Sequence, residues 1–73
     1  MCFTEWRAKC ILLFKTHWLA FQLNMGFVDK DRAKVLAMRN YIEYLARLMR
    51  GKCMTFTEAC DLLDRASQKM QAL

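Results

Sequence analysis

The stretch NMGFVDK, residues 24–30, decides the fold, because it separates two segments that each have the apolar periodicity of a helix. Gly26 stands where a left-handed residue commonly ends a helix, and the two apolar residues after it are suited to pack against the last turn. Asp29 is a good N-cap for a helix that begins at Lys30. This stretch therefore predicts the end of one helix, a tight turn and the start of another.

The segment before this turn, about residues 4–25, is predicted as the first helix. Apolar residues recur in it at alternating steps of three and four, which predicts a packing seam along one side. Leucines also occupy the opposite side, and such a wide apolar surface is typical of a central or an oligomeric helix. The seam consists of Ile11, Phe14, Trp18, Phe21 and Met25.

The segment of residues 30–50 is predicted as a second helix with two neighbouring apolar seams. Together the seams cover about half of the helix surface, and the sequence does not decide which of them is internal. Gly51 is expected to end this helix as Gly26 ends the first. The first seam consists of Val35, Met38, Ile42, Leu45 and Met49, and the second of Ala37, Tyr41, Tyr44 and Leu48.

A third helix is predicted over residues 56–73. Thr55 and Glu58 have the spacing of a capping box, in which the hydroxyl and the carboxylate each bind an otherwise unpaired amide. The apolar stripe that follows is narrow and keeps the spacing of a helix-packing seam. It comprises Phe56, Ala59, Leu63, Ala66, Met70 and Leu73.

These segments define one all-α domain over residues 1–73. The short connections favour antiparallel neighbours, so we predict a three-helix antiparallel bundle. The alternative is a helical hairpin of the first two helices that dimerises, with the third helix packed across the partner. Hydrophobic residues make up 56% of the chain, above the roughly 45–50% of an ordinary domain. Because so short a chain buries a smaller share of its surface than a larger domain does, this surplus predicts a homo-oligomer.

Few residues suit catalysis or metal binding. His17 is the only histidine, and the four cysteines form no C-x-x-C pair. Two glycines are too few for a glycine-rich phosphate loop. We therefore expect no enzyme activity, no metal and no cofactor.

The chain lacks both the run of about 20 apolar residues that spans a membrane and a signal-peptide pattern, so we expect a cytoplasmic protein with reduced cysteines.

Positive charge is concentrated in the second predicted helix, within a chain of net charge +5. On a helical wheel, most of these cations lie opposite the apolar half. Arginine suits bidentate contacts to phosphate or carboxylate groups, so nucleic acid and an acidic protein face are both candidate partners. The alternative is a solvated helix face in which Glu43 bridges Arg39 and Arg47. This basic stripe consists of Arg32, Arg39, Arg47, Arg50 and Lys52.

Four aromatic residues are candidate contacts to a partner protein. Trp6 lies with Phe3 near the start of the first predicted helix, where an exposed pair could anchor a partner. The alternative is that the tryptophan simply buries its area in the core. Tyr41 and Tyr44 belong to the second seam of the second helix, and they would serve a partner if that seam faces outward.

A resemblance rests on HWLAF (residues 17–21), DR (31–32) and RNY (39–41), which give a Trp-Leu step on one helix and an arginine-rich step on the next. In this pattern the chain resembles the PerC-like and related small regulators of virulence transcription in enteric bacteria. The resemblance implies a bacterial regulator that acts through protein contacts or through DNA.

The sequence thus predicts a small helical regulatory or adaptor protein that binds another protein, with transcription as one process it could modulate. The alternative is a nucleic-acid-binding module that uses the basic stripe. Binding to a membrane surface ranks last, because three capped helices of similar length can cover one another's apolar faces.

Overall fold

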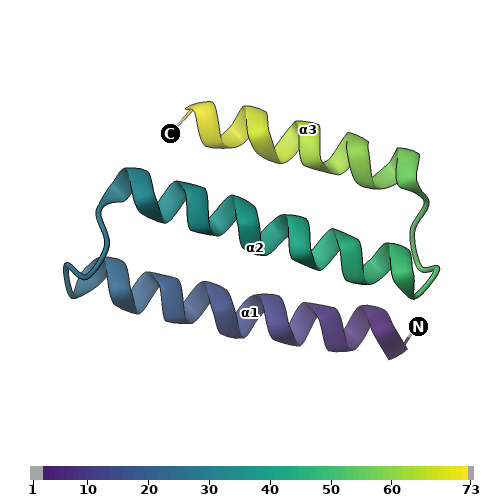
Figure 1. The fold of residues 1–73 in the computed structure, drawn as a ribbon, viewed down its shortest axis with the longest axis horizontal. Helices are drawn as coiled ribbons and strands as arrows, with labels where there is room; N and C mark the ends of the chain where they lie inside the picture. Colours follow the sequence, from purple (N-terminus) through teal and green to yellow (C-terminus); the bar gives the residue numbers. More distant parts are fainter. Residues whose placement is uncertain (1–2, 73) are drawn as a thin grey trace.

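A computed structural model describes residues 3–72 and contains three α-helices in that range (Figure 1). They are α1 (Phe3–Asn24), α2 (Lys30–Arg50) and α3 (Phe56–Ala72). No strand occurs between residues 3 and 72, so the all-helical prediction is confirmed. α1 begins and ends one residue before the predicted range, α2 coincides with it, and the last residue predicted for α3, Leu73, lies outside the described residues.

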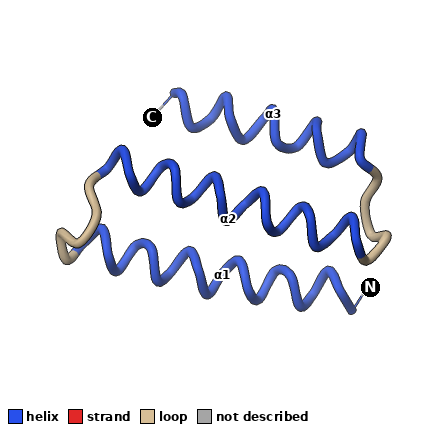
Figure 2. The backbone as a smooth tube through the Cα atoms, viewed as in Figure 1, coloured by secondary structure: helices blue, strands red, loops and turns tan. Residues whose placement is uncertain are grey.

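The three helices lie side by side in one layer, with α2 between α1 and α3 and neighbours antiparallel (Figures 1 and 2). α1 and α3 both pack on α2, and within the described range they do not pack on each other. The principal extents are 37 × 24 × 14 Å and the radius of gyration is 13.1 Å, whereas a compact chain of this length has about 11 Å. The helices are therefore antiparallel, as predicted, but they form an open layer. α3 packs on α2 of the same chain and not across a partner.

The main cluster of buried residues lies at one end of this layer, where α1 starts, α2 ends and α3 starts, and Ala33 of α2 is buried apart from it. Its buried members are Ala8 of α1, Leu45 and Leu48 of α2, and Ala59 of α3. The two alanines let the helices approach closely, and the leucines fill the space between them. Half-buried side chains complete this cluster: Tyr41, Tyr44, Met49, Cys53, Met54, Leu62 and Leu63.

The turn between α1 and α2 has the geometry that its sequence predicts. Gly26 is left-handed, with φ +76°. The Phe27 N–H donates to the carbonyl of Gln22 at 2.9 Å, and the Gly26 N–H donates to the carbonyl of Leu23 at 3.2 Å, which is a Schellman motif. Asp29 then caps α2, since its Oδ1 accepts the Arg32 N–H at 2.7 Å.

The turn after α2 differs from its prediction. Lys52, not Gly51, takes the left-handed conformation, with φ 59°, while Gly51 has φ −81°. The N–H groups of Lys52 and Cys53 donate back to the last turn of α2 at 3.0 and 2.9 Å. Gly51 has a different role, because a Cβ there would lie 2.8 Å from the Cβ of Thr4. The expectation that Gly51 supplies the left-handed residue is wrong, and the glycine instead lets α1 pass close to the end of α2.

The capping box of α3 forms only in part. The Thr55 hydroxyl accepts the Glu58 N–H at 3.2 Å, as predicted. The same hydroxyl donates to the Glu58 carboxylate at 3.0 Å, so that carboxylate binds the threonine side chain rather than its amide.

The cysteines are not all reduced in this structure. Cys53 is disulfide-bonded, whereas Cys10 and Cys60 are free and exposed. The expectation of reduced thiols is therefore wrong for Cys53, which removes the cysteines as an argument for a reducing compartment.

Candidate protein-binding surfaces

The side of α1 that faces away from α2 is apolar and exposed. Phe14, Trp18, Phe21 and Met25 of the predicted seam are all exposed, and only Ile11 is half-buried. The predicted packing seam therefore does not pack on α2 within the chain. α1 turns its other side to α2, because the small Ala8 allows a close approach there and an ion pair joins the two helices nearby.

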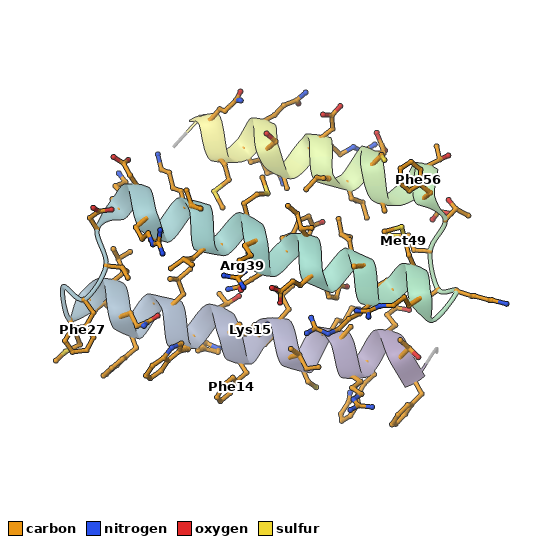
Figure 3. The ribbon with its side chains drawn as sticks, viewed as in Figure 1. Phe14, Lys15, Phe27, Arg39, Met49 and Phe56 are labelled. Carbon is orange, nitrogen blue, oxygen red and sulfur yellow. The ribbon has the colours of Figure 1, made fainter. Side chains whose placement is uncertain are left out.

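We call this exposed surface the outer edge of α1. Phe14 points away from α2 in Figure 3, and Phe27 extends the surface past the end of the helix. The rings of Trp18 and Phe21 stack with centroids 5.7 Å apart, and Phe27 meets Phe21 edge-on at 6.4 Å. A surface pocket of about 300 Å³ lies among Phe14, His17, Trp18 and Phe21. The outer edge comprises Phe3, Trp6, Leu13, Phe14, Trp18, Phe21, Met25 and Phe27.

An ion-pair cluster centred on Glu43 ties α1 to α2. Lys15 Nζ of α1 lies 2.7 Å from Glu43 Oε2, and Arg39 Nε lies 3.3 Å from Oε1. Arg47 approaches the same carboxylate at 4.0 Å, so Glu43 does bridge Arg39 and Arg47. The hydrogen bond from Lys15, followed by the charges of Lys15 and Arg39, lowers the pKa of Glu43. Lys15 and Arg39 lie between α1 and α2 in Figure 3.

A second apolar surface runs over α2 at the end of the layer that lacks the core. Two adjoining pockets of about 370 and 290 Å³ share Thr16, Ala37 and Met70, one residue from each helix. We call them together the apolar groove. Its α1 wall is Leu12, Thr16, Leu19, Ala20 and Leu23, its floor on α2 is Lys30, Ala33, Lys34, Ala37, Met38 and Tyr41, and its α3 wall is Ala66, Lys69 and Met70.

The four candidate aromatic residues lie in two places. Phe3 and Trp6 are exposed on the outer edge of α1. Tyr41 and Tyr44 are half-buried against the core, with ring centroids 5.9 Å apart, and burial raises the pKa of Tyr44. Only Tyr41 also reaches the apolar groove. The structure therefore does not bring the four together, and it places Phe3 and Trp6 where a partner can reach them.

The basic stripe is exposed except at Arg47, which is half-buried beside Glu43. Arg7 of α1 joins it, because Arg7, Arg47 and Arg50 line one surface pocket of about 490 Å³. Sequence reasoning missed Arg7, because the periodicity within α1 does not show which of its sides lies against the end of α2. We call this the arginine pocket; it is completed by Phe3, Thr4, Ala8, Ile11 and Gly51.

The part of the chain that the structure describes shows neither a cluster of metal-binding side chains nor a membrane-spanning helix. Residues 3–72 contain no group of three or more His, Cys, Asp or Glu side chains that could hold a metal ion. None of the helices in this range combines the length and apolarity needed to cross a membrane. Comparison with protein-family models, with curated proteins and with solved structures yields no match.

Proposed function

We propose that this chain is a small helical adaptor or regulator that acts by binding another protein in the apolar groove. The observation that carries the proposal is the position of the groove. α1 and α3 stand on either side of α2 without packing on each other, so apolar side chains of all three helices remain open to one further element.

The occupant that fits this groove is an amphipathic helix of the partner. A helix laid between α1 and α3 would pack on α2 and turn an open layer into a four-helix arrangement, which is the helix-in-groove mode of recognition. Lys30 and Lys69 lie among the lining residues, and no acidic side chain does. The partner helix should therefore carry acidic residues beside its apolar face.

Filling the groove tests this proposal. Thr16 is exposed and lines both pockets, so Thr16→Trp would occupy the groove without removing a core side chain. Thr57→Trp is the matched control, because Thr57 is exposed on α3 outside the groove. In affinity capture from the native host with identification by mass, at least one protein should be retained by the wild type and by Thr57→Trp and lost by Thr16→Trp. If no captured protein distinguishes the two variants, the groove is not the binding surface.

We further propose that the protein works as a homodimer. The chain exposes 5717 Å², whereas a compact protein of this mass exposes about 4,700 Å². The difference, roughly 1,000 Å², is close to the about 800 Å² that each partner loses in a standard interface. We also propose a regulatory role in transcription, and its support is the sequence resemblance alone.

A second candidate function is nucleic-acid binding, which the arginine pocket favours. Arg7, Arg47 and Arg50 bring cations from two helices to one place, where phosphate oxygens could be held by more than one guanidinium. Binding to DNA or RNA should then weaken steeply with salt, because phosphate contacts release counterions. Replacing Arg7 and Arg50 with Glu should abolish binding at low salt. Unchanged binding by that variant, or binding that does not depend on salt, would exclude the arginine pocket as a nucleic-acid site.

A further inference from the structure

We propose that the outer edge of α1 is covered by the outer edge of α1 from a second copy of this chain, packed antiparallel with Phe14 near the two-fold axis. This inference rests on the proposed homodimer and assigns its interface. The apolar groove lies on the other side of α1, toward α2 and α3, so the interface and the partner site are separate surfaces.

The exposed aromatic area matches what a stable dimer needs. An aromatic side chain has about 150–250 Å² of surface. The rings of the outer edge are exposed to between 47% and 74%, which corresponds to roughly 550–900 Å² of apolar surface on that scale. A standard interface buries about 800 Å² on each partner. Apolar patches of this size are uncommon on monomers, where the largest is about 300–600 Å².

The order of side chains along α1 suits a self-complementary, antiparallel contact. An axis at Phe14 sets Phe14 against its own copy, and it sets Cys10 against Trp18 of the second copy. It also sets Phe3 against Met25 at both ends. In the two Cys10–Trp18 pairs a small residue faces a large one, which suits close packing of helices. A parallel pair would instead set Trp18 against Trp18 and align the two helix dipoles unfavourably.

The cations beside the outer edge argue against a lipid surface as its occupant. Lys9 is paired with Glu5 at 3.6 Å, and Lys15 is paired with Glu43 at 2.7 Å. Amphipathic helices that lie on membranes use lysines and arginines beside the apolar face to attract anionic lipids. Here Lys9 and Lys15 are already paired with carboxylates of the same chain, and Lys15 faces α2, which leaves Arg7 as the exposed cation of α1 nearest the outer edge.

The mass of the protein in solution tests the location of the interface. Phe14→Glu introduces a charge at the proposed axis, and Phe56→Glu is the matched control, because Phe14 is 74% exposed and Phe56 is 73% exposed on α3 (Figure 3). In sedimentation equilibrium at micromolar concentration, the wild type and Phe56→Glu should have twice the chain mass, and Phe14→Glu the mass of one chain. Helical circular dichroism should be equal in all three.

The outcomes separate this inference from the proposals it rests on. If Phe14→Glu remains dimeric, the homodimer stands and its assignment to the outer edge is overturned. If the wild type is monomeric, the homodimer itself is overturned, while binding in the apolar groove is still decided by the Thr16→Trp variant. A monomeric wild type that floats with anionic vesicles, and loses flotation on Phe14→Glu, would identify the outer edge as a membrane surface instead.

Disulfide trapping tests the orientation. In Trp18→Cys, the new thiol should face the native Cys10 of the second copy, so mild oxidation should give a covalent dimer on a non-reducing gel. The double variant C10S/W18C lacks that pair and should stay uncrosslinked; both variants also carry Cys60→Ser, because Cys60 is free and exposed. Crosslinking of the double variant would indicate a parallel pair, and absence of crosslinking in both variants would also overturn the antiparallel arrangement.

Discussion

Two adjacent residues at the end of α2 have exchanged the backbone conformations that are usual for a glycine and a lysine. Lys52 has a Cβ yet takes the left-handed conformation, and Gly51 lacks one yet has an ordinary φ. A left-handed non-glycine residue costs about 1–2 kcal/mol. Lys52→Gly should therefore stabilise the protein by roughly 0.5–1 kcal/mol, since the greater freedom of the unfolded glycine offsets part of the gain. Urea unfolding measures this. Lys52→Ala removes the charge but keeps the Cβ, and an equal gain in that variant would contradict the explanation.

Gly51→Ala should have the opposite effect. The added Cβ would meet the side chain of Thr4, whose Cβ would be 2.8 Å away, and overpacking of this kind costs about 1–3 kcal/mol. The free energy of unfolding should fall by that amount. Adding Thr4→Ala removes the outer atoms of the threonine and should restore part of the loss. A double variant no more stable than Gly51→Ala would show that the contact with α1 is not the cause.

Glu43 should make stability depend on pH in the acid range. The pKa of Glu43 in the folded protein lies below its ordinary value of about 4.5. The carboxylate therefore adds its full contribution to the free energy of unfolding above pH 4.5, and this contribution is lost as the pH falls through the folded pKa. In an NMR titration, the Glu43 carboxyl should show a midpoint below 4.5. Lys15→Met removes the principal cause, so the midpoint should rise toward 4.5. No rise in that variant would mean that the contact between α1 and α2 does not hold the carboxylate.

At the scale of the element, the periodicity of the sequence predicts the helices well and their orientation poorly. The apolar period, Gly26 and Asp29 are local signals, and they locate the helices because each acts within a few residues. Which side of α1 meets α2 depends on packing between helices. Small Ala8 and charged Lys15 face α2, while the larger apolar Phe14 faces out. Hydrophobicity alone therefore selects the wrong side of α1 as the one that packs on α2. For the same reason, the sequence does not predict that Arg7 joins Arg47 and Arg50 in the arginine pocket.

α3 should be the least protected helix. It packs on α2 alone, its one buried residue, Ala59, lies near its start, and its second half forms a wall of the open groove. Few buried contacts mean that local opening costs little free energy. Amide hydrogen exchange should therefore be faster in residues 64–72 than in residues 40–48 of α2. Equal protection of the two stretches would indicate that something covers the groove in solution.

At the scale of the whole molecule, the flat layer exposes more surface to solvent than a compact chain of the same mass does. The two apolar surfaces lie on different sides of α1, so pairing through the outer edge would leave both apolar grooves open. The resulting dimer would expose an area near that expected for compact domains, and it would present two equivalent sites. Bivalent display of this kind strengthens binding to a partner that also has two copies.

Dimerisation through the outer edge has a thermodynamic consequence for the entire fold. A partner that binds only the folded chain stabilises it by mass action, so the thermal midpoint should rise with protein concentration. Between about 1 and 100 μM, the midpoint of the wild type should increase by several degrees, because an effect on the order of 1 kcal/mol shifts a domain of this size by about 4–8 °C. Phe14→Glu should unfold at the same temperature throughout this range, and Phe56→Glu should follow the wild type. A wild-type midpoint that does not change with concentration would mean that the excess surface is not covered by a second copy.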